Sequence, residues 1–317
     1  MSISLFSHNQ KAYESLIDVL ETERRACIIH PTGTGKSFIG FKYCEDHPEQ
    51  IILWLSPSDY IFKTQLENIK ATANGWQPEN IAFLTYAKLM QLCAEEIKEL
   101  KPDAIIFDEF HRCGAEQWGK GVQCLLNAYP NVPILGFTAT NIRYLDNQRD
   151  MADELFDNCV ASQMTLGEAI ATGILAAPKY VLSIFSFEQD LKAYESRVRR
   201  VKNRAVRVKA EEYLEAIRRA VEQADGLDII FKKHITNRRG KYILFVPSFE
   251  AMQSVKERCP DWFREIDSEP HLYSAYSDDP ETSKAFAAFK DDDSEHMKVL
   301  LTINMLNEGI HVDDISG

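Results

Sequence analysis

The stretch His30-Pro-Thr-Gly-Thr-Gly-Lys-Ser37 decides the fold of the first half of this chain. It directly follows the apolar run Ala26 to Ile29 and directly precedes a helical pattern that begins at Phe38. Glycines between a strand and a helix let the backbone turn its N–H groups inward around phosphate oxygens. Lys36 can then reach the β and γ phosphates, and Ser37 can offer its hydroxyl to Mg²⁺. The alternative is a glycine-rich turn with a surface lysine, but the flanking strand and helix favour a phosphate-binding loop.

Short apolar runs alternate with amphipathic stretches around this loop. We predict strands at Ala26 to His30, Ile51 to Ser56, Asn80 to Leu84, Asp103 to Asp108 and Pro133 to Phe137. Strands separated by helices pair in parallel through right-handed crossovers. The segment Thr165 to Glu168 has capping-box spacing, and Gly173 followed by Pro178 ends the helix that it starts. The fold class is therefore α/β, with a parallel sheet.

The second half of the chain continues this alternation less completely. From Phe187 to about Val221 the apolar residues step by three or four until the phase slips near Glu211, so we expect two helices or one bent helix. The other predicted elements are strands at Lys179 to Phe185, Lys241 to Val246, His271 to Tyr276 and Lys298 to Ile303, and a helix at Gln253 to Arg258.

Composition excludes several classes of protein. The chain has 317 residues, of which 45% are hydrophobic and 26% charged, so it is neither disordered nor collagen-like and is long enough for about two domains. No apolar stretch is long enough to span a membrane. The seven cysteines are scattered and form no C-x-x-C pair, which indicates reduced thiols without zinc or disulfide partners. We expect a cytoplasmic protein.

Positive charge is concentrated in one segment of an acidic chain. The formal net charge is -12, yet residues 187–241 hold 15 basic and 9 acidic residues. Arg200, Arg204 and Arg207 are candidate contacts to a nucleic-acid backbone. A charged helix face is equally often only solvated, so both interpretations stay open. A second candidate, or an exposed linker, is Phe231 to Lys241.

Two carboxylates follow a predicted strand in Ala104-Ile-Ile-Phe-Asp-Glu-Phe-His111. Open parallel sheets bind their ligands at the carboxyl ends of strands. There Asp108 would hold Mg²⁺ through water, and Glu109 would act as general base toward the attacking water. An isolated acidic pair is usually a solvated turn, but a preceding phosphate loop favours the catalytic interpretation.

Threonines also stand at predicted strand ends. They occur in Gly136-Phe-Thr-Ala-Thr140 and at Thr85, directly before Tyr86. Taken alone, such threonines are commonly turn caps.

The three motifs together resemble motifs I, II and III of the superfamily 2 helicases and translocases. The likeness is to the DExH group related to the motor subunits of type III restriction enzymes. The resemblance implies ATP and Mg²⁺ as cofactors. It implies phosphate binding by Thr32, Gly33, Thr34, Gly35, Lys36 and Ser37, and metal binding by Ser37 and Asp108. It implies catalysis by Lys36, Asp108 and Glu109, and coupling by His111, Thr138 and Thr140, with His111 coupling the two domains.

Weaker matches extend the resemblance over nearly the whole chain. Gln10 matches an adenine-reading Q motif, Pro57 ends a segment like motif Ia, and Thr85 lies in the segment after it. Tyr242 to Pro247 resembles motif IV, and Leu306 to His311 resembles motif V with Gly309 near the nucleotide. From these we expect nucleic-acid contacts at Pro57 and Thr85.

The chain departs from the family pattern at three places. His30 replaces the first glycine of the phosphate loop, and His311 replaces an aspartate of motif V, whose earlier Thr-Asp pair is Ile303-Asn304. Motif VI, which carries arginine fingers, does not follow before Gly317. We therefore expect a fragment of a longer motor, which binds ATP and hydrolyses it poorly alone.

These patterns predict a P-loop NTPase in three parts. Residues 1–180 form a RecA-like ATP-binding domain, 181–240 a helical connector with a basic face, and 241–317 a partial second RecA-like domain. The predicted function is that of an ATP-dependent helicase or translocase, which acts on nucleic acid, DNA rather than RNA. The relatives suggest a nuclease or methylase partner. We expect no contact with a membrane. The alternatives are a nucleotide-gated nucleic-acid-binding or scaffold module with vestigial hydrolysis and, less favoured, a small-molecule phosphotransferase.

Overall fold

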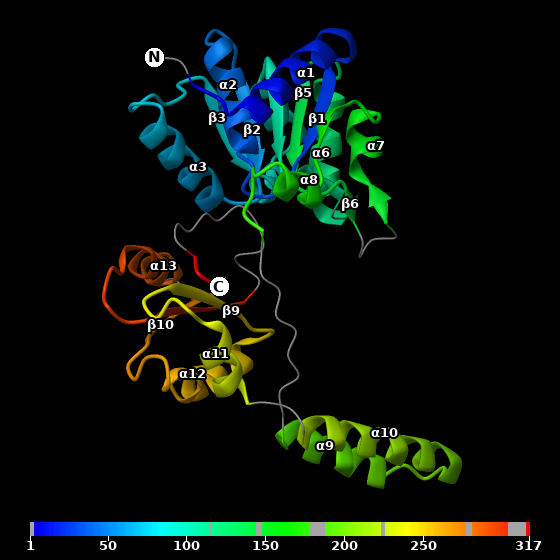
Figure 1. Ribbon diagram of the computed structural model, residues 1–317. Helices are drawn as coiled ribbons and strands as arrows, with labels where there is room; N and C mark the ends of the chain where they lie inside the picture. The colour runs from blue at the N-terminus through cyan, green and yellow to red at the C-terminus, as the bar shows by residue number, and fades with distance from the viewer. Residues whose placement is uncertain are drawn as a thin grey trace. The chain divides into compact units, whose positions relative to one another are not determined.

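A computed structural model of the chain describes residues 3–114, 116–143, 148–177, 188–222, 226–276, 281–303 and 315–317. They form two compact units, the first ending at Ala177 (Figure 1). The strand predicted at Lys179 to Phe185 and the segment like motif V, with Gly309, lie outside the described residues. The division at residues 180 and 240 stays a prediction.

A parallel sheet of six strands forms the centre of the first unit, in the order β3-β2-β4-β5-β1-β8. The strands are β1 (Arg25–Ile29), β2 (Ile52–Ser56), β3 (Ile81–Thr85), β4 (Ala104–Asp108), β5 (Ile134–Thr138) and β8 (Val160–Gln163). The first five lie within one residue of their predicted bounds, which confirms the α/β class. The sixth was not predicted, because it is a short, partly polar strand at the sheet edge.

Helices cover both faces of this sheet (Figure 1). One face packs Trp54 and Phe137 against α1, α2 and α3, and the other packs Phe107 against α4 to α7 and the 3₁₀ helix Phe110–Gly114. Burial on both faces is why the strands are continuous apolar runs. The helices are α1 (Ser7–Glu23), α2 (Lys36–Asp46), α3 (Asp59–Thr72), α4 (Tyr86–Gln91), α5 (Ala94–Glu99), α6 (Glu116–Ala128), α7 (Met151–Phe156) and α8 (Leu166–Ala171).

Two small elements complete the first unit. The predicted capping box is present at the start of α8, where Thr165 Oγ1 accepts from the Glu168 backbone N–H at 3.1 Å and Glu168 Oε2 accepts from the Thr165 backbone N–H at 2.7 Å. The strands β6 (Ile142–Arg143) and β7 (Arg149–Asp150) form an antiparallel pair after β5.

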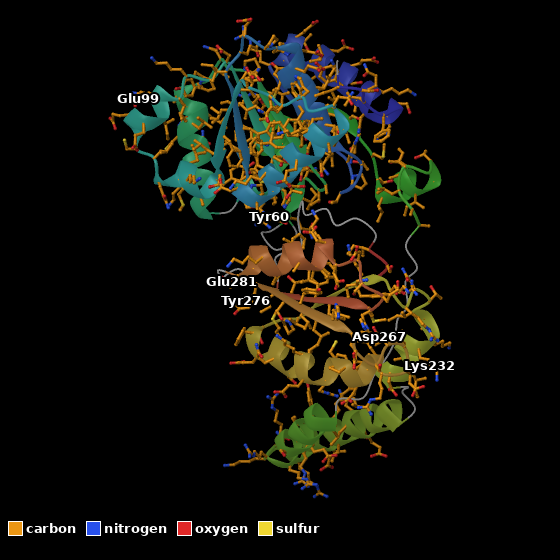
Figure 2. The ribbon with its side chains drawn as sticks, turned by 90° about the vertical axis from the view of Figure 1, so that its left-hand side faces the viewer. Tyr60, Glu99, Lys232, Asp267, Tyr276 and Glu281 are labelled. Carbon is orange, nitrogen blue, oxygen red and sulfur yellow. The ribbon has the colours of Figure 1, made fainter. Side chains whose placement is uncertain are left out.

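The second unit contains a smaller parallel sheet in the order β10-β11-β9. Phe263 and Met297 lie in its core, and Asp267, labelled in Figure 2, accepts from the Met297 backbone N–H at 2.7 Å and so holds the loop after α12 against β11. Its elements are α11 (Leu227–His234), β9 (Lys241–Phe245), α12 (Phe249–Phe263), β10 (His271–Tyr276), α13 (Thr282–Asp291) and β11 (Lys298–Ile303). All three strands predicted here are confirmed, and α12 contains the helix predicted at Gln253 to Arg258.

Two helices, α9 (Glu188–Arg199) and α10 (Arg204–Glu222), form a hairpin before α11, so of the two predicted alternatives the two-helix one is confirmed. The break lies at residues 200–203, whereas a phase slip was expected near Glu211. Asn203 Oδ1 accepts from the backbone N–H of Ala205 at 3.0 Å and of Val206 at 3.3 Å, so it caps α10 and fixes the break. In the part of the chain that the structure describes, no helix is long and apolar enough to cross a membrane.

We predict that Gly136→Ala destabilises the first unit by roughly 1 to 3 kcal/mol. A Cβ at this position in β5 would overlap the buried ring of Phe156 and lie 2.9 Å from Phe110 Cδ1. Neither ring can move without disturbing the core. Urea denaturation followed by circular dichroism measures the change.

Gly167→Ala is the matched control. Gly167 is exposed in α8, and its nearest neighbour to an added Cβ is Thr165 Oγ1 at 3.9 Å. Alanine there should leave stability unchanged or raise it by about 0.5 to 1 kcal/mol. Equal effects of the two substitutions would contradict the packing argument.

Candidate nucleotide-binding site

The loop between β1 and α2 has the backbone that its glycines permit. Gly33 and Gly35 have φ of 88° and 85°, in the left-handed region that other residues avoid. Gly35 also lacks space, because a Cβ would lie 2.7 Å from Asn9 Nδ2. His30 does not have a positive φ, so a glycine is not required at the position where this loop departs from the common pattern.

His30 connects the loop to the sheet. Its backbone N–H donates to the Thr138 carbonyl at 3.1 Å, and its Nε2 lies 2.8 Å from Ser162 Oγ in β8. Burial, helped by the charge of Lys36, lowers the pKa of His30 to about 4. His30 therefore links the loop to β5 through its backbone and to β8 through a neutral side chain.

Lys36 begins α2 and is buried within the loop. Its Nζ donates to the carbonyl oxygens of His30 at 2.9 Å and Pro31 at 3.3 Å. Burial lowers the pKa of Lys36, while the charges of Glu109 and Asp108 raise it, and the net shift is downward. The other predicted loop residues lie beside it: Thr32 and Gly33 exposed at the tip, Thr34 buried, and Ser37 in the first turn of α2.

Asp108 ends β4 and is almost fully buried. Its Oδ2 accepts from Gln65 Nε2 at 3.0 Å and from Ser56 Oγ at 3.5 Å, and its backbone carbonyl accepts from the Tyr86 hydroxyl at 2.8 Å. Burial and the neighbouring charge of Glu109 raise the pKa of Asp108. This carboxylate would therefore be stabilised by a nearby cation.

The donor set here fits Mg²⁺. The ion prefers carboxylate, hydroxyl and water oxygens. Asp108 and Ser37 supply the first two kinds, and Gln65 Oε1 is buried without a hydrogen-bond partner in the described residues. Such an acceptor suits a water molecule on a bound ion.

Glu109 is turned toward the loop by an unusual backbone. Its φ is 51°, a strained value for a residue with a side chain, and such strain often marks functional sites. Burial raises its pKa, but the hydrogen bond from His111 and the charge of Lys36 outweigh burial, so the pKa of Glu109 is lowered. The carboxylate is therefore ionised and able to accept a proton.

A short hydrogen-bond network joins the end of β4 to the end of β5. His111 Nδ1 lies 2.8 Å from Thr138 Oγ1 and 3.4 Å from Glu109 Oε2. Thr138 Oγ1 donates to the Thr140 carbonyl at 2.8 Å. Because a hydroxyl has one proton, this bond leaves His111 Nδ1–H as the donor to Thr138. His111 and Thr138 thus contact each other and Glu109, and Thr140 contacts Thr138.

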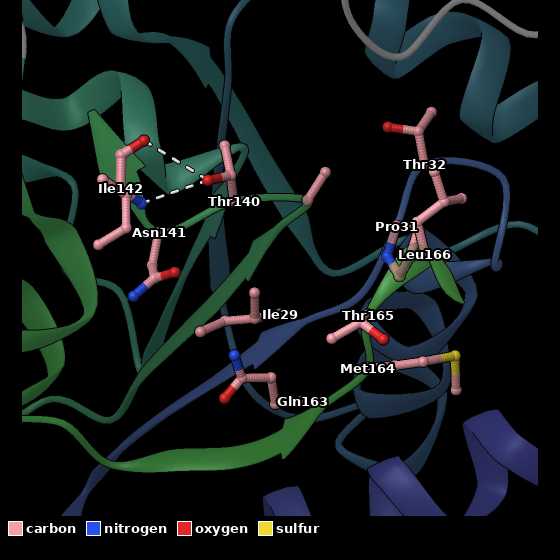
Figure 3. Close-up of a pocket in the computed structure, with 11 residues that line it drawn as sticks. Ile29, Pro31, Thr32, Thr140, Asn141, Ile142, Gln163, Met164, Thr165 and Leu166 are labelled. Atoms are coloured by element: carbon pink, nitrogen blue, oxygen red, sulfur yellow. Dashed lines mark hydrogen bonds between the residues drawn. The ribbon is translucent and has the colours of Figure 1, made fainter. Parts of the chain in front are cut away.

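A pocket of about 440 Å³ opens beside the loop (Figure 3). Pro31 and Thr32 line one side and Gln163 to Leu166 another. Thr140 lines it too and bonds the backbone N–H and carbonyl of Ile142 at 3.3 and 3.4 Å, as the dashed lines show. No residue that lines it is charged, so the phosphate chemistry belongs to the loop itself.

Other predicted site residues lie farther from this cluster. Gln10 is exposed on α1 and donates to Glu14 Oε1 at 2.9 Å, so its contact with adenine stays a prediction. Pro57 directly follows β2. Thr85 ends β3, and its Oγ1 accepts from the Lys88 backbone N–H at 3.1 Å as the cap of α4. Their contacts with nucleic acid also stay predictions.

Sequence reasoning missed three residues that hold the site. Asn9 is fully buried, and its Nδ2 donates to the Thr34 carbonyl at 2.9 Å, so α1 supports the loop. Gln65 and Tyr86 hold the side chain and the backbone of Asp108. Asn9 directly precedes Gln10, so the match of Gln10 to a Q motif was a signal for this part of α1. A glutamine in an amphipathic helix is normally solvated, so nothing marked Gln65.

Comparisons with known proteins agree with this geometry. Residues 2–143 match the family model described as "Type III restriction enzyme, res subunit". The solved structures with a similar fold include the DNA-bound ATP-dependent Type ISP restriction-modification enzyme LlaBIII, at 16% identity and a TM-score of 0.63 over 99% of this chain. No curated protein matches the sequence.

Two further structures share the fold. The DEAH/RHA helicase HrpB of Escherichia coli is 15% identical, with a TM-score of 0.57 over 95% of this chain. A protein of Vibrio vulnificus YJ016 described as the HsdR subunit of a type I restriction enzyme is 18% identical, with a TM-score of 0.56 over 96%. The chain spans 25% of LlaBIII, 35% of HrpB and 55% of the HsdR fragment.

The family match covers the loop between β1 and α2, both carboxylates at the end of β4 and the threonines after β5, which are the residues that the fold brings to one edge of the sheet. Over residues 2–143 the chain is similar to this family of restriction-enzyme subunits, and it shares its fold with the restriction-enzyme and helicase structures.

Proposed function

We propose that this chain is part of an ATP-dependent motor that moves on nucleic acid, DNA rather than RNA. The observation that carries the proposal is the contact of Glu109 with His111 and Thr138, beside the buried Lys36. A phosphate loop alone would bind nucleotide. A general base in contact with the next strand can also transmit hydrolysis to the rest of the sheet.

In this proposal the loop N–H groups and Lys36 bind the phosphates of ATP. Ser37 and Asp108 hold Mg²⁺, which supplies neutralising charge to the phosphates when bound. Glu109 accepts the proton of the attacking water, whose oxygen bonds to the γ phosphorus while the bond to the β–γ bridging oxygen breaks. The products are ADP and phosphate, and Glu109 returns the proton to solvent. Burial of Lys36 and Glu109 strengthens these interactions, because the local dielectric is low.

Coupling would run through the network at the ends of β4 and β5. Any shift of Glu109 when the γ phosphate leaves changes its distance to His111 and Thr138. Thr138 also accepts, through its backbone carbonyl, the N–H of His30 in the loop. The same residue therefore contacts both parts of the nucleotide site and is suited to relay its state to Thr140.

We predict that Glu109→Gln leaves ATP binding intact and lowers hydrolysis by roughly 10²- to 10⁴-fold, the usual contribution of a general base. The amide retains the shape of the side chain but cannot take the proton from water. ATP binding is measured by calorimetry, and hydrolysis under single-turnover conditions with duplex DNA, which also detects slow turnover.

Glu79→Gln makes the same chemical change on an exposed carboxylate and should alter neither quantity. Unchanged hydrolysis in Glu109→Gln would refute the assignment. If the wild type binds ATP but does not hydrolyse it in the presence of any polynucleotide, the nucleotide-gated binding or scaffold module would be favoured instead.

We also predict that Thr138→Val reduces the stimulation of hydrolysis by DNA about tenfold, the equivalent of one hydrogen bond of about 1.4 kcal/mol. Valine has nearly the same shape as threonine but cannot bond His111 or the Thr140 carbonyl. Thr138→Ser retains the hydroxyl and should retain the stimulation. ATP affinity should be the same in both variants, and equal stimulation in both would exclude the network from coupling.

A further inference from the structure

The turn between α9 and α10 has a strongly positive surface. Residues 197–209, here called the basic turn, contain seven basic residues and no acidic one. All seven side chains are exposed. They are Arg197, Arg199, Arg200, Lys202, Arg204, Arg207 and Lys209.

Few of these cations are neutralised within the hairpin. Arg207 Nε lies 2.8 Å from Glu211 Oε1, and the Arg197 guanidinium lies 6.0 Å from the centre of the Tyr194 ring. Among the described residues, no ion pair forms at the other five basic side chains. The basic turn is therefore a concentrated and largely unpaired positive charge.

This arrangement is unfavourable for the start of α10. Arg204 is the first residue of α10, and the first turn of that helix has no acidic residue. A helix N-terminus carries partial positive charge, so cations there destabilise the helix and carboxylates stabilise it. Arg197 and Arg199, in the last turn of α9, are by contrast favoured by the negative end of that helix. Arg204 has no such compensation among the described residues, which favours contact with an anionic partner.

The chemistry of the basic turn fits a phosphate backbone. Proteins that bind single strands combine cations with aromatic side chains on which bases stack. Residues 197–209 contain no aromatic side chain, and the exposed ring of the neighbouring Tyr194 lies near the Arg197 guanidinium, so the surface offers mainly charge and hydrogen-bond donors. A helix end of this kind can approach the wide major groove of B-form DNA, whereas the major groove of duplex RNA is deep and narrow.

We propose that the basic turn binds the phosphate backbone of double-stranded DNA, independently of base sequence. The proposal rests on the proposed function for its choice of polymer, and it adds a contact outside the helicase motifs. Through this turn the motor would bind duplex DNA whether or not a nucleotide is bound.

The test compares two triple variants with the same change in net charge. Arg200→Gln/Lys202→Gln/Arg204→Gln removes the centre of the basic turn, and Lys98→Gln/Lys101→Gln/Lys120→Gln removes three exposed cations from the first unit. Affinity for a short fluorescent DNA duplex is measured by anisotropy without nucleotide, between about 50 and 200 mM salt. Each lost phosphate contact lowers the slope of log affinity against log salt by about 0.9. The turn variant should lose about 2 to 3 units of slope, and the control none.

Two further measurements separate the proposal from its rivals. The turn variant should retain the wild-type melting temperature, because Arg204 opposes the positive end of α10 whereas Arg200 follows the negative end of α9. A large fall in the melting temperature would show that these side chains have a structural role and would overturn the proposal. A slope equal to that of the wild type would also overturn it. The proposal would likewise be overturned if the turn variant lost more affinity for a single strand or for an RNA duplex of the same sequence than for the DNA duplex. The slope is measured without nucleotide, so a failure of the ATPase assignment leaves this result readable.

Discussion

The parallel pairing of β5 between β1 and β4 is the constraint on which the site depends. In this register Ile29 lies opposite Thr138, and Asp108 lies opposite Phe137. Three strand ends from distant parts of the sequence therefore reach the same edge of the sheet at the same level. The loop, the carboxylates and the threonines meet there without any loop having to reach across the molecule. Close contact of Phe156 with Gly136 keeps β5 in this position.

Buried charge is the second feature that unites the site. Lys36, Asp108 and Glu109 are all shielded from water, and two anions face one cation. The pKa of Asp108 is raised and that of Glu109 is lowered, which indicates that Asp108 is the carboxylate that lacks a compensating positive charge. A divalent cation beside Asp108 would remove the deficit, whereas Glu109 is already stabilised by His111. The two adjacent carboxylates thus have different environments, and these match the different roles proposed for them.

The predictable parts of this protein were those with local causes. The first five strands were predicted within one residue because burial on both faces makes them continuous apolar runs. The loop was predicted because the residues that determine its conformation all lie in one stretch of eight, His30 to Ser37. Gln65 and Tyr86 could not be predicted, since they reach Asp108 only through the packing of α3 and α4. The break between α9 and α10 was misplaced because Asn203, a single capping residue, outweighs the phase of the apolar pattern.

Charge distribution argues that contact with a polyanion is local in this molecule. With a net charge of -12, most of the surface repels a phosphate backbone. Salt limits that repulsion to about 8 to 10 Å at ordinary ionic strength. A local cluster of cations such as the basic turn can therefore attract a phosphate backbone although the whole protein is acidic. In the proposed motor, repulsion elsewhere would limit the number of other contacts that have to break during movement.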